Sequence, residues 1–151
     1  MHAEINFLGH IINFEGIKPD NAKIENIINW SIPKTQTEIK QFLGLSGYYR
    51  RFIHNYSMIT KPMTRYLKKG AIIDYKNIEY TESFEKLEQI IASDQILTHP
   101  DFSKEFILTT DRCSFPKLFP SFAIRAVLSQ KLEDCKRLIS FASRTLNSNG
   151  N

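Results

Sequence analysis

The sequence has few of the residues that build metal centres or disulfide frameworks. Among 151 residues there are two cysteines, Cys113 and Cys135, and four scattered histidines. The cysteines form no C-x-x-C pair, so a structural zinc site is not predicted. The N-terminus has no basic segment followed by an apolar one, so no secretory leader is expected. Two thiols in such a chain indicate a reduced, intracellular protein.

Long hydrophobic runs are also missing. No apolar stretch approaches the roughly 18 residues that cross a bilayer, so no membrane partner is expected. Hydrophobic residues make up 42% of the chain and charged residues 24%. These are values of a globular protein, and the length suits one domain or pieces of two.

Acidic residues are nearly absent from residues 31–70. This stretch holds eight lysines and arginines but one acid, Glu38, whereas the other 111 residues hold 12 basic and 15 acidic side chains. Positive charge gathered in a quarter of the chain indicates a polyanion partner, above all nucleic acid. The alternative is a solvated face that carries lysines and binds nothing.

Hydrophobic periodicity predicts a β-hairpin, four helices and three consecutive strands. In chain order they cover residues 5–18, 20–30, 35–53, 62–70, 81–93, 105–110, 122–130 and 137–143. Asp20 is a predicted N-cap, Pro62 suits a first helical turn, and the glycine at 70 ends that helix. Residues 71–80 stay ambiguous. The order predicts an α+β chain made of two adjoining pieces.

The helix predicted over 35–53 begins with a capping box, Thr35 and Glu38. One face of it is apolar and is expected to enter the core. Its members are Ile39, Phe42, Leu43, Ser46, Tyr49 and Ile53. Trp30, Phe42 and Tyr49 are therefore interpreted as core residues rather than as stacking platforms.

The other face combines Lys40, Gly44 and Tyr48 at spacings of four, with Gly47 and Arg51 on its flank. Two glycines inside a helix cost on the order of 2 kcal/mol relative to alanine. Either tight helix packing or the close approach of a ligand backbone would offset that cost. The neighbouring charges favour the ligand, because a buried seam rarely carries them.

Short motifs follow one another along the chain in a recognisable order. They include Phe7-Leu8-Gly9-His10, Gly16-Ile17-Lys18-Pro19-Asp20, Phe42-Leu-Gly-Leu-Ser-Gly-Tyr-Tyr-Arg-Arg-Phe-Ile53, Lys61-Pro62-Met63-Thr64, His99-Pro100-Asp101-Phe102, Phe106-Ile-Leu-Thr-Thr-Asp111 and Ser140-Phe-Ala-Ser-Arg-Thr-Leu146. Over nearly its whole length the sequence resembles the reverse transcriptases of Gypsy-type LTR retrotransposons.

The resemblance implies a division of the chain. Residues 1–19 resemble a primer-grip hairpin, 20–70 a reverse transcriptase thumb, 71–100 the connection, and 101–151 the N-terminal part of a ribonuclease H-like domain. The implied fold is α+β: a β-hairpin and a helical thumb and connection, then three strands of an incomplete ribonuclease H-like α/β fold. The chain is expected to be a truncated piece of a Pol polyprotein.

The resemblance also implies partners and contacts. The expected partners are a template–primer duplex, RNA–DNA or DNA, and the remainder of the Pol polyprotein, in the cytoplasm or nucleus. In related polymerases the first thumb helix lays a polar residue, a glycine and an aromatic residue, each four apart, along the minor groove of the primer–template duplex. The implied nucleic-acid-binding residues are Lys40, Gly44, Tyr48, Arg51, Arg50, Leu8 and Gly9. Arg50 ranks second, because its stem could instead pack along the helix.

Asp111 falls on the first metal-binding carboxylate of a ribonuclease H-like site, which in the intact parent would hold Mg²⁺ with other acids. Arg125 replaces an expected glycine, residues 112–121 resemble an insertion, and the polymerase Asp-Asp pair is absent. Asp111 is thus the one candidate catalytic and metal-binding residue, and this chain is expected to hold no cofactor and to catalyse nothing alone.

The sequence leaves two functions open. The first is template–primer contact by a fragment of an RNA-directed DNA polymerase and ribonuclease H. The alternative is a domesticated or degenerate fragment that serves as a protein-interaction module or has no function. Its basis is the unpaired edge and uncovered apolar face expected of an incomplete sheet.

Overall fold

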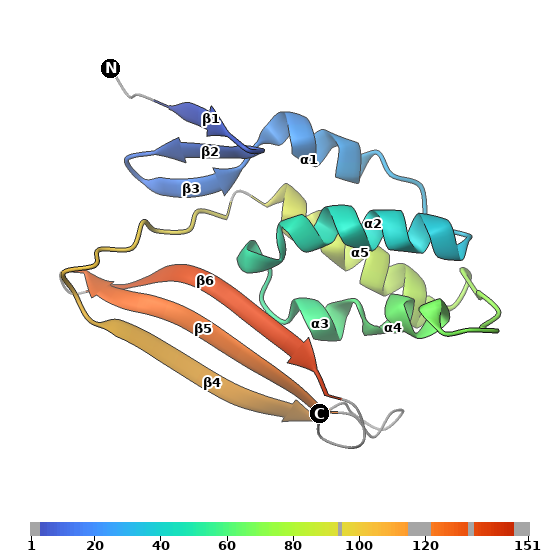
Figure 1. Cartoon of the computed structure of the whole chain (residues 1–151). Coiled ribbons are helices and arrows are strands. Elements are labelled where there is room, and N and C mark those ends of the chain that lie inside the picture. The colour runs from blue at the N-terminus through green and yellow to red at the C-terminus, as the bar shows by residue number, and fades with distance from the viewer. Residues whose placement is uncertain (1–3, 94, 115–121, 133–134, 147–151) are drawn as a thin grey trace.

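The computed structural model describes residues 4–93, 95–114, 122–132 and 135–146. Most of the apparent insertion, residues 115–121, lies outside the described residues, as do 147–151. The chain runs from a small sheet through a group of helices to a second, longer sheet (Figure 1). This mixed arrangement confirms the predicted α+β class.

The elements have the following bounds. The first sheet contains β1 (Ile5–Phe7), β2 (His10–Asn13) and β3 (Gly16–Pro19). The helical region contains α1 (Asn21–Ile28), α2 (Gln36–Tyr48), the 3₁₀ turn η1 (Arg50–Phe52), α3 (Tyr56–Ile59), α4 (Lys61–Thr64), the 3₁₀ turn η2 (Arg65–Leu67) and α5 (Ile78–Ala92). The second sheet contains β4 (Phe106–Ser114), β5 (Phe122–Leu132) and β6 (Cys135–Thr145).

The N-terminal sheet is an antiparallel meander in the order β1-β2-β3 rather than the predicted hairpin. Its first turn is formed by Leu8 and Gly9, which both have positive φ, 47° and 74°. Two left-handed residues in succession are the hallmark of a two-residue type I′ turn. Leucine rarely adopts this conformation, so the sequence did not indicate a turn there.

Helix α1 begins as predicted. The Asp20 carboxylate accepts a hydrogen bond from the Ala22 N–H at 3.1 Å. Ile24 and Ile27 are buried, whereas Ile28 is 46% exposed. Because its eight residues make only about two turns, α1 buries two side chains, those of Ile24 and Ile27.

Helix α2 is capped by Thr35, whose hydroxyl accepts from the Glu38 N–H at 3.2 Å. The Glu38 carboxylate in turn accepts from the Lys34 N–H at 2.7 Å, one residue before the position that the capping box predicts. The helix ends at Tyr48, not at 53, and η1 follows. Gly44 and Gly47 weaken the last turns of α2. The tighter 3₁₀ turn η1 then places the Phe52 ring against the His10 ring, with 5.6 Å between the ring centroids.

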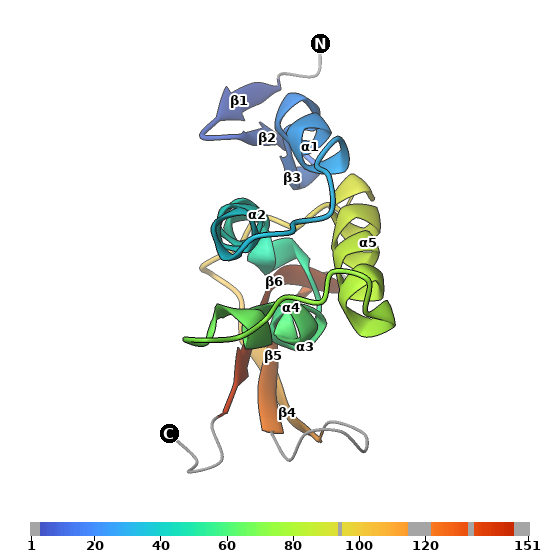
Figure 2. The ribbon, with the colours of Figure 1, turned by 90° about the vertical axis from the view of Figure 1, so that its right-hand side faces the viewer.

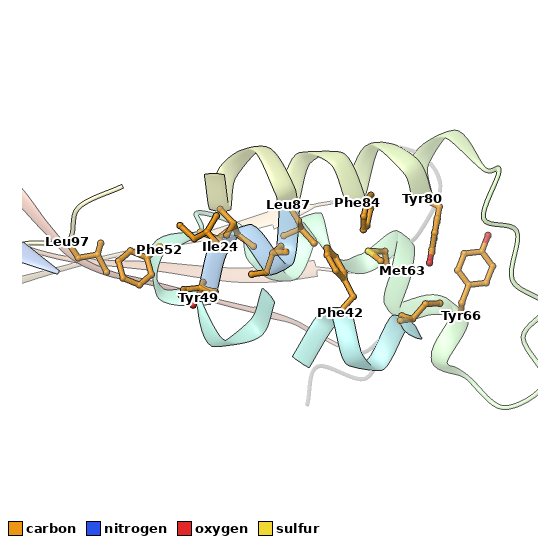
Figure 3. Packing of buried hydrophobic residues seen from close by; sticks show 14 residues of the cluster. Ile24, Phe42, Tyr49, Phe52, Met63, Tyr66, Tyr80, Phe84, Leu87 and Leu97 are labelled. Atoms are coloured by element: carbon orange, nitrogen blue, oxygen red, sulfur yellow. The ribbon is translucent and has the colours of Figure 1, made fainter. Parts of the chain in front are cut away.

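A single hydrophobic core holds the helices together (Figure 3). Phe42 of α2 packs on Phe84 of α5 with 4.8 Å between ring centroids, and Leu87 is fully buried beside them. The buried Tyr80 hydroxyl donates to the Pro33 carbonyl at 2.7 Å. Helix α5 starts at Ile78, three residues before the predicted start, because Asn77 caps it.

The second sheet is antiparallel in the order β4-β5-β6, and its strands are longer than predicted. Strand β6 lies against η1 and α3 (Figures 1 and 2). There the Ser57 N–H donates to the Ser143 hydroxyl at 2.9 Å, and the His54 and Phe141 rings meet at 5.2 Å. Among the helices that the structure describes, none is long and apolar enough to cross a membrane.

Candidate nucleic-acid interface

Helix α2 presents the predicted polar line to solvent. Lys40 and Gly44 are exposed, and the Tyr48 side chain is 48% exposed. On the opposite side of the same helix Ile39 and Phe42 are completely buried. The register proposed from the sequence is therefore the one that the fold adopts, with the apolar face inward and the Lys40, Gly44 and Tyr48 line outward.

The two glycines of α2 have different surroundings. A Cβ placed on Gly47 would lie 3.3 Å from the Tyr56 hydroxyl. That hydroxyl is held by the Leu43 carbonyl at 3.1 Å and by the Ser46 hydroxyl at 3.0 Å, so it cannot yield freely. A Cβ on Gly44 would meet nothing within 4 Å. Packing inside the chain thus explains Gly47 but leaves Gly44 unexplained.

The Leu8–Gly9 turn lies directly beside this line. The Tyr48 hydroxyl donates a hydrogen bond to the Leu8 carbonyl, and it lies 3.3 Å from His10 Nδ1. A Cβ on Gly9 would lie 3.6 Å from the Tyr48 ring. Leu8 itself is 72% exposed. The fold therefore brings together the turn and the helix face, which are 40 residues apart in the sequence.

His10 fixes the turn against the helical region. Its ring contacts Tyr48, Tyr49 and Phe52 at centroid distances of 5.1, 6.0 and 5.6 Å. Burial lowers the pKa of His10 below its ordinary value, and the nearby Arg51 charge lowers it further. The His10 side chain thus holds the turn against the helical region through its ring contacts.

Arg50 and Arg51 follow the end of α2 in η1. Arg50 is exposed, and Arg51 is partly buried with its guanidinium 5.7 Å from the centre of the Phe52 ring. The sequence did not point to Tyr56, whose hydroxyl reaches back from α3 to Gly47. The spacing between these two residues follows no helical or strand period, so no sequence pattern pointed to the contact.

Asp111 lies far from the α2 line, on β4, opposite Arg125 of β5. Arg125 Nε donates to the Asp111 carboxylate at 2.9 Å, and a second guanidinium N–H binds the same oxygen. These bonds and the arginine charge hold the pKa of Asp111 below its usual range. A guanidinium thus takes the place where a cation would bind.

The residues that the structure describes do not fit the magnesium site that the resemblance implies for the parent. Within the part of the chain that the structure describes, no three acidic, histidine or cysteine side chains are grouped so that they could hold a metal. The one candidate ligand, Asp111, is already engaged by Arg125.

Comparisons with known proteins show what the chain is similar to. Residues 77–150 match the family described as the RNase H-like domain found in reverse transcriptase. Over 97% of its length the chain is 50% identical to the retrovirus-related Pol polyprotein from transposon 297 and 35% identical to that from transposon opus, both of Drosophila melanogaster. The Tf2-3 polyprotein of Schizosaccharomyces pombe is 34% identical over 89% of the chain. The chain spans only 13%, 15% and 10% of these polyproteins.

The fold is similar to that of solved foamy viral protease–reverse transcriptase structures. One of these, a complex with double-stranded DNA, matches 97% of this chain and 29% of its own, with a TM-score of 0.75 and 22% identity. Another, with an RNA/DNA hybrid, gives a TM-score of 0.76 and 23% identity. The chain is thus similar along almost all its length to retrotransposon Pol polyproteins, and its residues 77–150 match the RNase H-like domain found in reverse transcriptase.

Proposed function

We propose that this chain is a piece of a Gypsy-type retrotransposon Pol protein that holds a template–primer duplex and performs no catalysis on its own. Lys40, Gly44 and Tyr48 would follow the minor groove. The Leu8–Gly9 turn would lie at the end of the primer strand. The same proposal divides the chain into a primer-grip hairpin (1–19), a thumb (20–70), a connection (71–100) and part of a ribonuclease H-like domain (101–151).

One observation carries the proposal: Gly44 has no partner inside the described fold. A glycine in the interior of an exposed helix costs about 1 kcal/mol relative to alanine, and nothing in the described chain offsets this. A ligand backbone that approaches the helix closely would offset it. Lys40 and the Tyr48 ring on the same line suit phosphates and sugars, which position a duplex without reading its sequence.

Two further findings support a duplex as the ligand. The helix lies in the basic stretch 31–70, which carries a single acidic residue. The foamy viral proteins of similar fold were solved in complexes with double-stranded DNA and with an RNA/DNA hybrid. The contacts expected here are mostly with the backbone, so affinity should fall steeply as salt rises.

The test is a titration of a labelled RNA–DNA duplex at two salt concentrations with the wild type, Gly44→Ala and Gly47→Ala. We expect Gly44→Ala to raise the free energy of unfolding by up to about 1 kcal/mol. We also expect it to weaken duplex binding about tenfold, or ~1.4 kcal/mol. Gly47→Ala adds the same methyl group against Tyr56 and should leave duplex affinity unchanged wherever the protein is folded.

The outcome of this comparison is decisive in both directions. A more stable Gly44→Ala protein with weakened binding would support a duplex on the α2 face. Binding that ignores salt, a complete absence of binding, or equal affinity of Gly44→Ala and the wild type would contradict it.

A second candidate function rests on the apolar face of the C-terminal sheet. Phe106, Leu108 and Ile124 are 42%, 63% and 44% exposed. Cross-strand pairing puts Ile124 opposite Arg112, four pairs along from Leu108, so Phe106, Leu108 and Ile124 all point to one side of the sheet. This face suits contact with another protein segment, such as the remainder of the Pol polyprotein. Sedimentation of the wild type and Leu108→Lys would test it: a self-association or partner contact that survives the lysine argues against this face.

A further inference from the structure

A cavity of about 540 Å³ separates the end of α2 from the C-terminal sheet. Tyr48, Arg50, Arg51 and Tyr56 line it on the helical side, and residues 140–143 of β6 line it on the other. Strand β6 is held there by the hydrogen bond from the Ser57 N–H to the Ser143 hydroxyl. The cavity is therefore built by two parts of the chain that are about 90 residues apart.

The lining of the cavity is positively charged. Arg50 and Arg51 line it, and no acidic residue is among its lining residues. In the described part of the chain neither arginine takes part in an ion pair. Two guanidinium groups without a carboxylate partner favour an anion that can accept several hydrogen bonds, which is the chemistry of phosphate.

Hydroxyl groups complete the site. The Ser143 oxygen accepts from the Ser57 N–H, which leaves its own O–H free to donate. The Tyr56 hydroxyl is fixed by Ser46 and by the Leu43 carbonyl, so this wall of the cavity is rigid. Donors on both sides, arginine on one and serine on the other, suit a ligand that passes between them.

Tyr48 connects this cavity to the exposed line on α2. The same side chain ends the Lys40–Gly44–Tyr48 line and lines the cavity. A ligand that follows the line would thus reach the two arginines next. The volume exceeds that of one phosphate group, so a chain of sugars and phosphates fits better than a free ion.

We infer that the cavity between η1 and β6 binds the sugar–phosphate backbone of a nucleic-acid strand. Arg50 and Arg51 hold its phosphates, and the strand passes from the helical region onto the C-terminal sheet. This inference rests on the proposed function, because it extends the path of the same duplex. It assigns to Arg50 and Arg51 phosphate contacts inside a cavity whose other wall is β6.

The experiment uses duplex length to separate the cavity from the α2 face. A hairpin of about 6 base pairs matches the length of α2, given about 1.5 Å per residue and about 3.4 Å per base pair. A duplex of about 16 base pairs would reach the cavity as well. Affinity for both is measured over a salt series with the wild type, Arg50→Gln/Arg51→Gln, and the control Lys76→Gln/Lys86→Gln, which removes two exposed charges elsewhere.

We expect the arginine variant to reduce the slope of log affinity against log salt by about 2 for the long duplex and by about 0 for the short one. The control should keep the wild-type slope with both. Equal slopes of the arginine variant and the wild type on the long duplex would overturn the cavity assignment alone. No binding of either duplex by the wild type would overturn the proposed function and this inference together.

A direct readout follows the arginine side chains themselves. The Nε–H resonances of Arg50 and Arg51 are recorded by NMR during titration with an abasic deoxyribose-phosphate oligomer, and in parallel with inorganic phosphate. Shifts caused by the oligomer at concentrations where phosphate has no effect support a backbone site. Equal shifts with both would make the cavity a free-phosphate site and overturn the inference, as would no shift with the oligomer.

Discussion

The helical region and the C-terminal sheet are stabilised in different ways. The buried hydrophobic cluster draws its residues from Ile24 to Leu97, so it belongs to the helices and the segment after them. In the described part of the second sheet, Ala123 and Ile139 are the buried hydrophobic residues. The helical region has a core of its own, whereas the sheet depends on its hydrogen-bond ladder and on contact with α3 and η1.

This difference affects how firmly each of the two parts is held in place. A firm core behind α2 keeps the exposed line of Lys40, Gly44 and Tyr48 in a fixed geometry, which the proposed contact with a duplex would require. Among the described residues, the sheet is joined to it by polar contacts such as the Ser57–Ser143 bond and by apolar ones such as the packing of Leu138 on the core. Contact with a duplex on both parts would hold them together.

The largest expected effect comes from emptying the helical core. Phe42→Ala removes a completely buried ring that packs on Phe84, and we expect a loss of about 3–5 kcal/mol in the free energy of unfolding. Leu108→Ala on the exposed face of β4 should cost less than about 1 kcal/mol. Urea denaturation of both variants measures this, and similar losses would mean that the sheet has a core as important as that of the helices.

A smaller effect is expected where the sheet meets the helices. Ser143→Ala leaves the Ser57 N–H without its acceptor, and we expect a loss of about 1 kcal/mol. Hydrogen exchange at the Ser57 amide should accelerate by about tenfold. Thr110→Ala on β4 serves as the control, since Thr110 is exposed. Unchanged exchange at Ser57 would show that this bond does not hold the sheet in place.

Acidification should weaken both parts through two histidines. Burial lowers the pKa of His10 and of His54 below 6.5, with help from Arg51 and Arg125 respectively. The unfolded chain therefore takes up protons that the folded protein resists, so stability is complete above about pH 6.5 and falls as the pH drops below it.

Thermal unfolding between about pH 7.5 and about pH 5.5 checks this, in a range that spans the ordinary pKa of histidine. His10→Gln tests the contact between the first sheet and the helices, and His54→Gln tests the contact with the second sheet. Each variant should show a smaller decline than the wild type. A midpoint that rises on acidification would contradict the direction of both pKa shifts.

The smallest effect is expected at the Asp111–Arg125 pair. It lies at the surface, where ion pairs contribute little to stability, so Asp111→Asn should leave the unfolding midpoint unchanged within error. Calorimetric titration with MgCl₂ should show no heat of specific Mg²⁺ binding for either protein. Metal-dependent RNA cleavage that Asp111→Asn abolishes would restore the nuclease interpretation.

The sequence predicted the parts of the fold that local chemistry decides. Asp20 and Thr35 cap their helices as expected, because an N-cap needs only its own side chain and the next turn. The buried and exposed faces of α2 followed from their 3.6-residue period. The end of α2 at Tyr48 was missed, since no proline stops the helix there and its neighbours across space decide the break.

Tertiary contacts explain the remaining errors at the candidate site. Lys40, Gly44 and Tyr48 could be grouped from spacing alone. Whether a glycine is packed or open depends on Tyr56, and that could be read only from the fold. The arginine cavity was missed for the same reason, because its other wall comes from β6.

The segment after α5 joins the two sheets through consecutive residues. Leu97 pairs with Ile17 of β3, and the next N–H, of Thr98, donates to the Leu138 carbonyl of β6 at 2.7 Å. During synthesis at about 5–20 residues per second, β3 would wait roughly 4–16 s for Leu97 to be made. The outer edge of β3 stays without this partner over that interval. The order of translation thus makes the first sheet one of the last parts of this fold to be completed, although it is the first part to be made.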